Sequence, residues 1–376
     1  MSRDRSAGWE FRRAPHLLLH WQENQLVLHN YAVRRTLPAH ALVIDVLGQF
    51  DAWRRLGQYL DTVPAAARDS VRRLVHELHR QRLLWRRDEP LSPDERAMDA
   101  WDQWNPSAGF FHSASKDVSF IDMDTHLGRL AEQASTWPMP SPLKEYPRAR
   151  RVRLPKPRTR GAFPRVLRAR RTWRRFADAP LDLEALSTML HLTVGVQQWA
   201  TAEGEGRIAL KTSPSGGARH PIEAYVAARD VRSLAPGFYH YAAGAHALER
   251  VGRSRHLPRL DALLPTQWWY REAAALVLFT AVFERTRWRY NGPRAYRAVL
   301  LEAGHVCQTF CLTATWLGLA PFCSMALADA AIEKALGLDG VSESVLYAAG
   351  VGRRPALPAD VPPGALPSRT RRARTR

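Results

Sequence analysis

The chain has 376 residues, of which 45% are hydrophobic and 9% aromatic, enough to bury one large core or two smaller ones. It carries no apolar run of about 18 residues and only a short apolar stretch near its start, so we expect a cytoplasmic protein with no membrane partner. The net charge of +19 concentrates in residues 148–160 and 368–376. Because no zinc-finger or RNP-type motif accompanies these stretches, we favour solvated charge, then an acidic polypeptide partner, and nucleic acid last.

The first 90 residues predict a small module. Residues 16–35 alternate apolar and polar around the turn-prone pair Glu23-Asn24, which indicates a β-hairpin. Two helical patterns and a short apolar return at residues 82–85 follow, and their apolar positions are Leu42, Val46, Leu47 and Phe50, then Val71, Leu74, Val75 and Leu78. We interpret residues 1–90 as a winged-helix-like module. It could read DNA, but no residue is diagnostic, so we favour peptide docking or packing.

Residues 91–164 are rich in Pro, Arg and Asp, and their aromatic anchors are Trp101, Trp104, Phe110 and Phe111. We expect a connector packed on the larger domain. A basic disordered tail is expected at residues 357–376, which are poor in apolar residues.

Residues 165–356 form the predicted larger domain. An amphipathic helix is expected from residue 183, and the apolar runs predict three internal strands, at residues 222–228, 273–283 and 344–352. The longest helix is predicted at residues 294–317, and its broad apolar stripe fits either a central core helix or a subunit interface. The expected fold class is α+β, a mostly antiparallel sheet flanked by helices.

Three cysteines are too few for a disulfide framework. A lone CxxxC pair is weak as a metal site. We therefore expect reduced core thiols at Cys307, Cys311 and Cys323, and no metal.

The stretch "KTSPSGGARHPIEAYV" (residues 211–226) places Pro214, Ser215, Gly216 and Gly217 before a predicted strand. Glycine permits close approach to a backbone, and proline reduces the entropy lost on ordering, so such a loop could hold a phosphate or a planar ring. A plain turn leading into a strand would use the same residues.

A second stretch places Arg170, Thr172 and Arg174 at alternate positions. In an extended segment these side chains project from one face, where two guanidinium groups and a hydroxyl would suit a phosphate monoester. In an arginine-rich chain the same spacing also arises by chance.

These stretches together carry a family resemblance. The Arg170-x-Thr172-x-Arg174-x-Phe176 segment, "PSGGARHPIEAYV", "PGFYHYAAGAHALE", "EAGHVCQTFCLTATWLGLAP" and the closing "LYAAGVG" occur in the order and spacing of one family. Residues 165–354 resemble the flavin-dependent nitroreductase superfamily, and more closely its SagB-type branch, the azoline dehydrogenases. "WNPSAGFFHSASKDV" and the module before it also resemble what precedes the flavin domain in this branch.

The resemblance implies a nitroreductase-like FMN-binding fold and a homodimer in which both subunits contribute to each FMN site. Arg170, Thr172 and Arg174 match the positions that hold the phosphate and ribityl chain, and the loop of Pro214, Ser215, Gly216 and Gly217 matches the one laid against the flavin ring. The backbone at Met325 and Ala326 falls where the family directs an N–H toward flavin N5. Arg353 or Arg354 could complete the phosphate site, and Lys211 stands where relatives often have arginine.

The resemblance also suggests the catalytic residues. In "GFYHY", His240 and Tyr241 match a Lys-Tyr pair that azoline dehydrogenases use for proton abstraction, and either could serve as base. The alternative is that the tyrosines only pack in a hairpin. For Glu302 and His305 we favour structural hydrogen bonding within a buried helix.

Three functions follow. The leading one is an FMN-dependent dehydrogenase that oxidises a peptide-derived azoline, a thiazoline or oxazoline, in natural-product biosynthesis, acting on a modified peptide or carrier-bound substrate with a partner cyclodehydratase. The second is an NAD(P)H-dependent nitro or quinone reductase. The third is a noncatalytic peptide-docking subunit.

Overall fold

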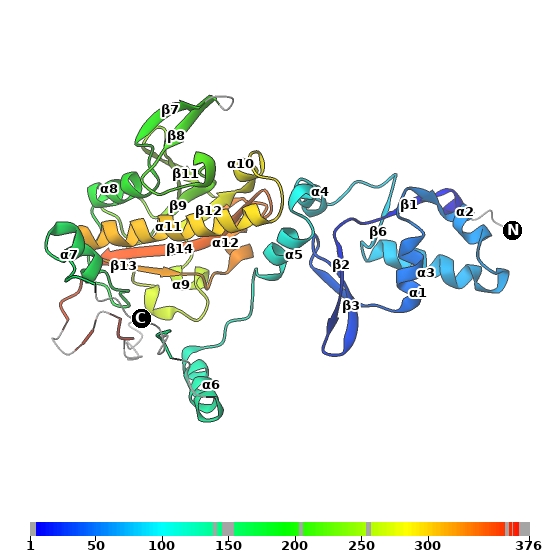
Figure 1. The fold of residues 1–376 in the computed structure, drawn as a ribbon, viewed down its shortest axis with the longest axis horizontal. Helices are drawn as coiled ribbons and strands as arrows, with labels where there is room; N and C mark the ends of the chain where they lie inside the picture. Colours follow the sequence, from blue (N-terminus) through cyan, green and yellow to red (C-terminus); the bar gives the residue numbers. More distant parts are fainter. Residues whose placement is uncertain are drawn as a thin grey trace, which may run out of the picture. The chain divides into compact units, whose positions relative to one another are not determined.

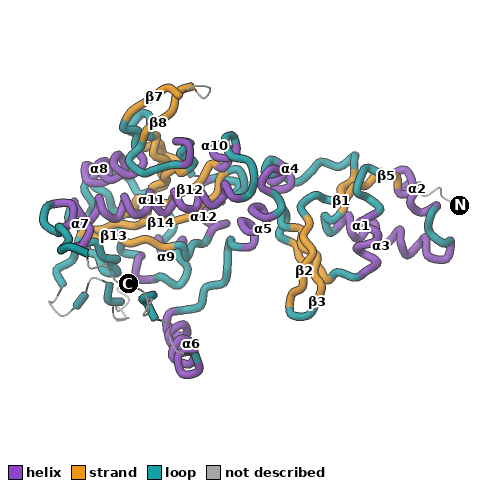
Figure 2. The backbone as a smooth tube through the Cα atoms, viewed as in Figure 1, coloured by secondary structure: helices purple, strands orange, loops and turns teal. Residues whose placement is uncertain are grey.

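The structure is a computed structural model that describes residues 5–137, 141–144, 154–202, 206–252, 257–357, 361–362 and 364–367 (Figures 1 and 2). It contains two compact units. The first comprises Met1–Val118, Val282–Val299 and Leu338–Ser344, and the second comprises Ser119–Ala281, Leu300–Gly337 and Val345–Arg376. The four domain ranges expected from sequence stay predictions, and residues 368–376 of the basic tail lie outside the described residues.

The N-terminal part of the first unit contains two small sheets. Strands β1 (Glu10–Arg13), β5 (Arg54–Arg55) and β6 (Leu84–Arg86) form one sheet in the order β5-β1-β6. Strands β2 (Leu17–Gln22), β3 (Gln25–Asn30) and β4 (Arg35–Pro38) form the other as a meander. The two residues of the β2–β3 turn, Glu23 and Asn24, have φ values of 46° and 65°, as a two-residue hairpin loop requires. The predicted hairpin is confirmed.

Three helices accompany these strands, and their apolar positions form a core with β1. They are α1 (Ala41–Gly48), α2 (Leu56–Asp61) and α3 (Arg68–Arg80). Phe11, Val46, Phe50 and Val75 are fully buried in this core, which also holds Leu78. Seven of the eight predicted apolar positions of the two helical faces therefore contribute to this core. The prediction for Leu42 is wrong, because its side chain, in the first turn of α1, is 56% exposed.

A second core of the first unit joins segments that are far apart in the sequence. It is built from α4 (Pro93–Asp99), α5 (Ser107–Ala114) and α10 (Phe283–Arg287). The indole nitrogens of two fully buried residues, Trp101 and Trp104, donate to backbone oxygens of Val341 (3.1 Å) and Tyr290 (3.2 Å). Backbone groups 240 and 186 residues later in the chain thus satisfy both buried donors.

The second unit is organised around a six-stranded sheet with the order β11-β10-β9-β12-β14-β13. These strands are β9 (Ile222–Ala228), β10 (Gly237–Ala242), β11 (Ala247–Val251), β12 (Ala275–Val282), β13 (Leu319–Ser324) and β14 (Glu343–Arg353). The pairs β10–β11, β9–β10, β9–β12 and β13–β14 are antiparallel. A separate hairpin contains β7 (Gln198–Ala202) and β8 (Gly206–Leu210). All three predicted internal strands, and the α+β class, are confirmed.

Helices flank this sheet. They are α7 (Ala162–Ala169), α8 (Leu183–Val194), α9 (Leu260–Leu263), α11 (Arg294–Trp316) and α12 (Asp329–Leu336). The second unit also contains α6 (Met123–Thr136), which buries none of its residues. Helix α11 runs along one face of the sheet (Figure 1), where Phe310 packs edge-on against Phe279 of β12 with ring centroids 6.2 Å apart. It leaves Leu301 64% exposed and Trp316 59% exposed. The described residues include no helix long and apolar enough to cross a membrane.

Candidate functional site

The segment after α7 lies against β13. The backbone N–H of Trp173 donates to the carbonyl of Pro321 (2.9 Å), and the indole is buried with the guanidinium of Arg354 5.3 Å from its ring centre. The side chains of Arg170, Thr172 and Arg174, at the alternate positions, are half-buried. The sequence pattern therefore corresponds to one buried anchor among polar side chains at the edge of the sheet.

Arg174 and Arg175 line a cavity of about 270 Å³, together with Arg271 and Trp268. Nη1 of Arg174 donates to the carbonyl of Gly364, but its Nε is buried and has no hydrogen-bond partner within the described part of the chain. The Nε of Arg175 is likewise buried and has no hydrogen-bond partner among the described residues. A buried guanidinium N–H without an acceptor is costly, and an anionic oxygen would satisfy it. The cavity thus offers guanidinium donors to a phosphate, although the carboxylates of Asp178 and Glu272 also line it and Glu272 pairs with Arg271.

The two C-terminal arginines of β14 have other partners. Arg354 donates to the carbonyls of Leu319 (2.8 Å) and Thr315 (3.2 Å), and so holds the end of α11 against β13. The guanidinium of Arg353 lies 3.4 Å from a carboxylate oxygen of Asp182. Of the two, Arg353 is the freer to reach a further anion, because among the described residues its guanidinium takes part in an exposed ion pair and not in hydrogen bonds that hold the fold together.

The loop of Pro214–Gly217 is fastened to α11. The hydroxyl of Ser213 lies 2.8 Å from that of Thr309, and Nδ1 of His305 lies 3.3 Å from the carbonyl of Pro214. Within the loop the Ser215 hydroxyl accepts from the N–H of His220 (2.8 Å). Pro214 and Gly216 are exposed and Lys211 is half-buried, so the loop presents its backbone at the surface.

Gly217 adopts φ 60° in a 3-10 turn, a conformation that glycine accepts without strain. The structural role expected for His305 is seen in its contact with the loop. Glu302 contributes similarly, since its carboxylate lies 3.8 Å from Nδ1 of His220. The expectation that His305 is buried is wrong, because the helix turns this side chain to the surface.

Beyond β13 the chain presents Met325, which is 71% exposed. The backbone N–H of Ala326 donates to the hydroxyl of Ser324 (3.1 Å), which donates in turn to the side-chain oxygen of Gln267 (2.8 Å). The N–H of Ala326 is therefore already engaged, and Met325 is the residue of this pair with an exposed surface.

The side chains of Tyr241 and His240 lie on opposite faces of the sheet. Successive residues of a strand alternate, and the registers Phe279 with Ala224 and Tyr239 with Val226 put Tyr239 and Tyr241 on the face that α11 covers. His240 lies on the other face. One substrate atom can therefore meet at most one of the two side chains.

Tyr241 is 2% exposed and borders a second cavity of about 270 Å³, between β10 and α8. Its hydroxyl lies 2.7 Å from Nδ1 of His246, and Nε2 of His246 lies 2.9 Å from the hydroxyl of Ser187. Burial raises the pKa of Tyr241. His246 is exposed, so the pair connects a buried phenol with solvent.

His240 is held between two carboxylates. Nε2 lies 3.0 Å from Glu223 and Nδ1 lies 2.9 Å from Glu249. Because carboxylates only accept, both ring nitrogens carry hydrogen in this arrangement, which is the imidazolium form. The hydrogen bond to Glu223, with that to Glu249, raises the pKa of His240 to about 9 despite burial. This environment favours an ion-pair role over that of a neutral base.

The predicted site residues form two groups. Arg170–Arg174, the Pro214 loop and Met325 adjoin α11 or β13, whereas Tyr241 lies on β10, four strands away in the sheet. At about 4.8 Å per strand this separation is about 19 Å. Sequence reasoning missed His246 and Ser187, although His246 stands in "YHYAAGAHALE", five residues after Tyr241.

Comparison with known proteins supports a family assignment. Residues 167–353 match the nitroreductase family. The chain is 34% identical over 189 residues to "Putative nitroreductase MJ1384" of Methanocaldococcus jannaschii, covering 50% of this chain and 89% of that protein. It is 30% identical over 173 residues to "Trifolitoxin-processing protein TfxB" of Rhizobium leguminosarum bv. trifolii, covering 45% of this chain and 46% of the relative.

Among solved structures, a "putative nitroreductase in complex with FMN" from Desulfovibrio desulfuricans is similar, with a TM-score of 0.37 and 21% identity, over 56% of this chain and 93% of that one. The match to MJ1384, at 34% identity over 89% of that protein, establishes the family. The chain belongs to the nitroreductase family of flavin-dependent oxidoreductases.

Proposed function

We propose that this protein is an FMN-dependent dehydrogenase that oxidises a peptide-derived azoline to the azole. The observation that carries the proposal is the contact of the buried Tyr241 hydroxyl with the exposed His246. Oxidation of a C–H bond to a double bond releases one proton for each hydride removed, so such an enzyme needs a proton acceptor with a route to solvent. The Tyr241–His246 pair supplies both.

The residues that would hold FMN fit its chemistry. The unpartnered buried Nε of Arg174 suits a phosphate oxygen, and Arg170 and Thr172 lie on the same side of the segment. The exposed backbone of Pro214–Gly217 would lie against the ring, with Lys211 nearby in the chain and Met325 at the end of β13. Arg353 would complete the phosphate site. When bound, FMN would accept hydride from the substrate.

We assign the proton acceptor to Tyr241. The phenol oxygen would take the substrate α proton as its own hydrogen passes to Nδ1 of His246, and Nε2 of that ring would release a hydrogen toward Ser187 or water. His240 would act by position, its imidazolium holding Glu223 and Glu249 together beneath β10. This division of roles follows from the two faces of the strand.

We propose a homodimer that brings the two groups of site residues together. Within one chain Tyr241 lies on β10, whereas the Arg170–Arg174 segment lies against β13, four strands or about 19 Å away. A second copy packed on α11 would cover Leu301 and Trp316, which are large, apolar and more than half exposed. The exposed Pro214 loop, fastened to α11, would then lie at the subunit interface.

The proposed substrate class rests on the similarity to TfxB and on the small N-terminal sheets and helices of the first unit. TfxB is named for trifolitoxin processing, and this chain is 30% identical to it, but over less than half of its length. A modified peptide delivered by a partner cyclodehydratase is therefore our proposal for the substrate and partner. The small N-terminal sheets and helices would dock that peptide.

The test is mass spectrometry of candidate azoline-containing precursor peptides incubated with the flavin-loaded protein in air. A product lighter by two hydrogen atoms per azoline is expected. An unchanged mass with every azoline peptide tested, from protein that carries FMN, would reject the dehydrogenase.

The second candidate is a reductase. The relative MJ1384, whose name states a nitroreductase, matches this chain over 89% of its length. Rapid bleaching of the flavin by NADPH under anaerobic conditions, followed by reoxidation with a nitroarene or quinone, would favour this function over the dehydrogenase.

A further inference from the structure

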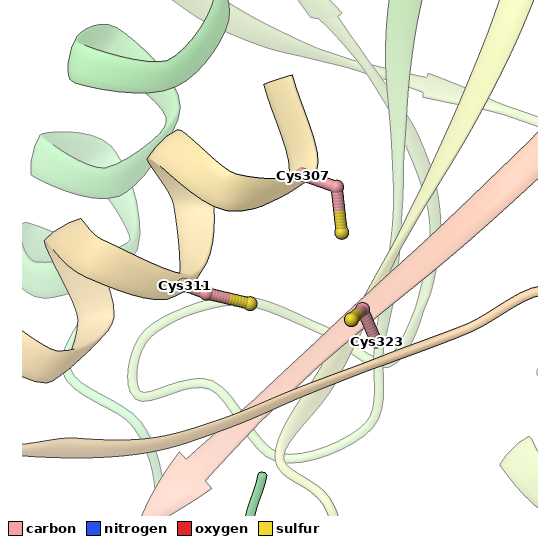
Figure 3. A group of neighbouring side chains, drawn as sticks. All are labelled: Cys307, Cys311 and Cys323. Atoms are coloured by element: carbon pink, nitrogen blue, oxygen red, sulfur yellow. The ribbon is translucent and has the colours of Figure 1, made fainter. Parts of the chain in front are cut away.

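Three thiols from two distant segments meet beneath α11. Cys307 and Cys311 lie one helical turn apart, and Figure 3 shows their side chains pointing toward Cys323 of β13. The three sulfur atoms all lie within 4.8 Å of one another. Cys307 and Cys311 are 2% and 3% exposed, whereas Cys323 is only half-buried. The cluster is therefore compact, and it is accessible from the side of Cys323.

Polar and charged groups lie beside the cluster. The hydroxyl of Tyr347 donates to Sγ of Cys323 (3.5 Å). The guanidinium of Arg170 lies close enough to act electrostatically on Cys311 and Cys323. A cation held by the three sulfurs would therefore have a hydroxyl and a guanidinium next to its ligands.

We propose that Cys307, Cys311 and Cys323 bind a thiophilic cation, for which Zn²⁺ is the probe. A cation bound tetrahedrally by three thiolates at about 2.3 Å would place the sulfurs about 3.8 Å apart, a spacing that fits within the 4.8 Å limit of the cluster. Soft thiolate ligands select zinc or copper(I) over magnesium or calcium. Binding would release the thiol protons of the ligands and leave the fourth zinc position to water.

Charge balance favours such an ion over bare thiols. Three thiolates around Zn²⁺ carry one net negative charge, which the guanidinium of Arg170 would neutralise, since it acts on both Cys311 and Cys323. The expected set of reduced core thiols remains the alternative. A CxxxC pair alone is weak as a metal site, and here the third ligand comes from a strand that sequence spacing does not reveal.

The experiment begins with protein stripped of metal by a chelator under reducing, anaerobic conditions. Zn²⁺ is titrated in competition with a chromophoric chelator, and the zinc K-edge absorption spectrum of the loaded wild-type protein counts the sulfur ligands. We expect one Zn²⁺ per chain, three sulfurs at about 2.3 Å, protection of all three thiols from alkylation, and no competition by Mg²⁺.

Variants locate the site. Cys307→Ser, Cys311→Ser and Cys323→Ser should each weaken Zn²⁺ binding at least about a hundredfold, and Tyr347→Phe about tenfold, as for the loss of an outer-shell partner. Thr313→Val, on α11 with all three thiols intact, is the matched control and should bind as wild type. Fewer than three sulfurs in the wild-type spectrum, or unaltered affinity in the Cys323→Ser variant, would overturn the proposal. Both readouts are independent of flavin and of activity.

Discussion

The hydroxyl of Tyr241 lies 2.7 Å from Nδ1 of His246, across the turn that joins β10 to β11. If the phenol donates, Nδ1 accepts and Nε2 bears the hydrogen directed at Ser187. The contact therefore gives a buried phenol a defined route for its proton. It makes His246 a positioning and relay residue that can be tested separately from Tyr241.

Tyr241→Phe should retain the flavin and the fold but reduce the rate of flavin reduction by substrate about 10²- to 10⁴-fold, the usual range for a lost acid–base group. Only the hydroxyl is removed, so ring packing persists. The measurement is anaerobic single-turnover reduction with an azoline peptide. His246→Gln should slow the reaction less and shift its pH profile. A wild-type rate in Tyr241→Phe would place the base elsewhere.

The stability of the second unit should depend on pH through His240. Its pKa is raised from 6.5 to about 9, chiefly by Glu223, so the folded protein holds this proton more tightly than the unfolded chain does. The contribution is complete below pH 6.5 and is lost as the pH rises through 9. Its size is at most about 3 kcal/mol, reduced by the exposure of Glu249.

Denaturant unfolding of wild type and His240→Gln from about pH 6 to about pH 10 tests this sign. The difference in unfolding free energy should be largest at low pH and should shrink toward high pH. Glu223→Gln removes the main partner and should flatten the profile in the same way. A difference that grows with pH would contradict the ion-pair assignment.

Flavin retention should depend on Arg170 and Arg174. Each charge-assisted hydrogen bond is worth about 1.5–3 kcal/mol, so Arg170→Ala with Arg174→Ala should weaken FMN binding at least about tenfold. Fluorescence titration of the stripped protein with FMN measures the change. Arg72→Ala, which removes an ion pair with Asp69 in the first unit, is the control and should bind FMN normally.

Gly350 of β14 has no side chain, and this leaves room for an aromatic stack to pack against the sheet. A Cβ at this position would lie 2.2 Å from ring atoms of Phe322, and that ring is stacked on Tyr270 with centroids 3.6 Å apart, so it has little room to move. Gly350→Ala should therefore destabilise the protein by about 1–3 kcal/mol. Thermal unfolding measures this loss, and Gly128→Ala on α6, where a Cβ would meet nothing within 4 Å, is the control.

The proposed dimer should depend on the outer surface of α11. Leu301→Asp would place a charge where a second copy is expected to pack, and should yield monomers by light scattering together with loss of FMN. Leu130→Asp, on an exposed position of α6, is the matched control and should remain dimeric. Dimeric, flavin-loaded Leu301→Asp protein would place the interface elsewhere.

Much of the fold can be predicted from the sequence where the signal is local. The strand Ile222–Ala228 coincides with its apolar run, and α11 ends one residue from its predicted limit. These elements are long or uniformly apolar, so periodicity identifies them. Because neighbouring residues of a strand point to opposite faces, the sequence of β10 also implies that His240 and Tyr241 face opposite ways. Matching the two residues to a catalytic Lys-Tyr pair drew attention away from this.

Other features depend on contacts between distant segments. The position of His240 between Glu223 and Glu249 follows from the registers of three strands, and the approach of Cys323 to α11 follows from the packing of β13. No local pattern encodes either arrangement. The sequence predicts that the backbone at Met325 and Ala326 faces the flavin. It likewise could not reveal that the N–H of Ala326 already donates to the hydroxyl of Ser324.

The first unit is built from three segments that are far apart in the chain, and this affects when it can fold during synthesis on the ribosome. The acceptor for the indole N–H of Trp101 is Val341, 240 residues later in the chain. At 5–20 residues per second, a ribosome synthesises the intervening chain in about 10 to 50 seconds. The ring of Phe283 and the acceptor of Trp104, Tyr290, are synthesised earlier, so Trp101 waits longest for its acceptor. The second aromatic core therefore has to assemble late, after most of the chain has been synthesised, and a chain interrupted before residue 341 cannot complete it.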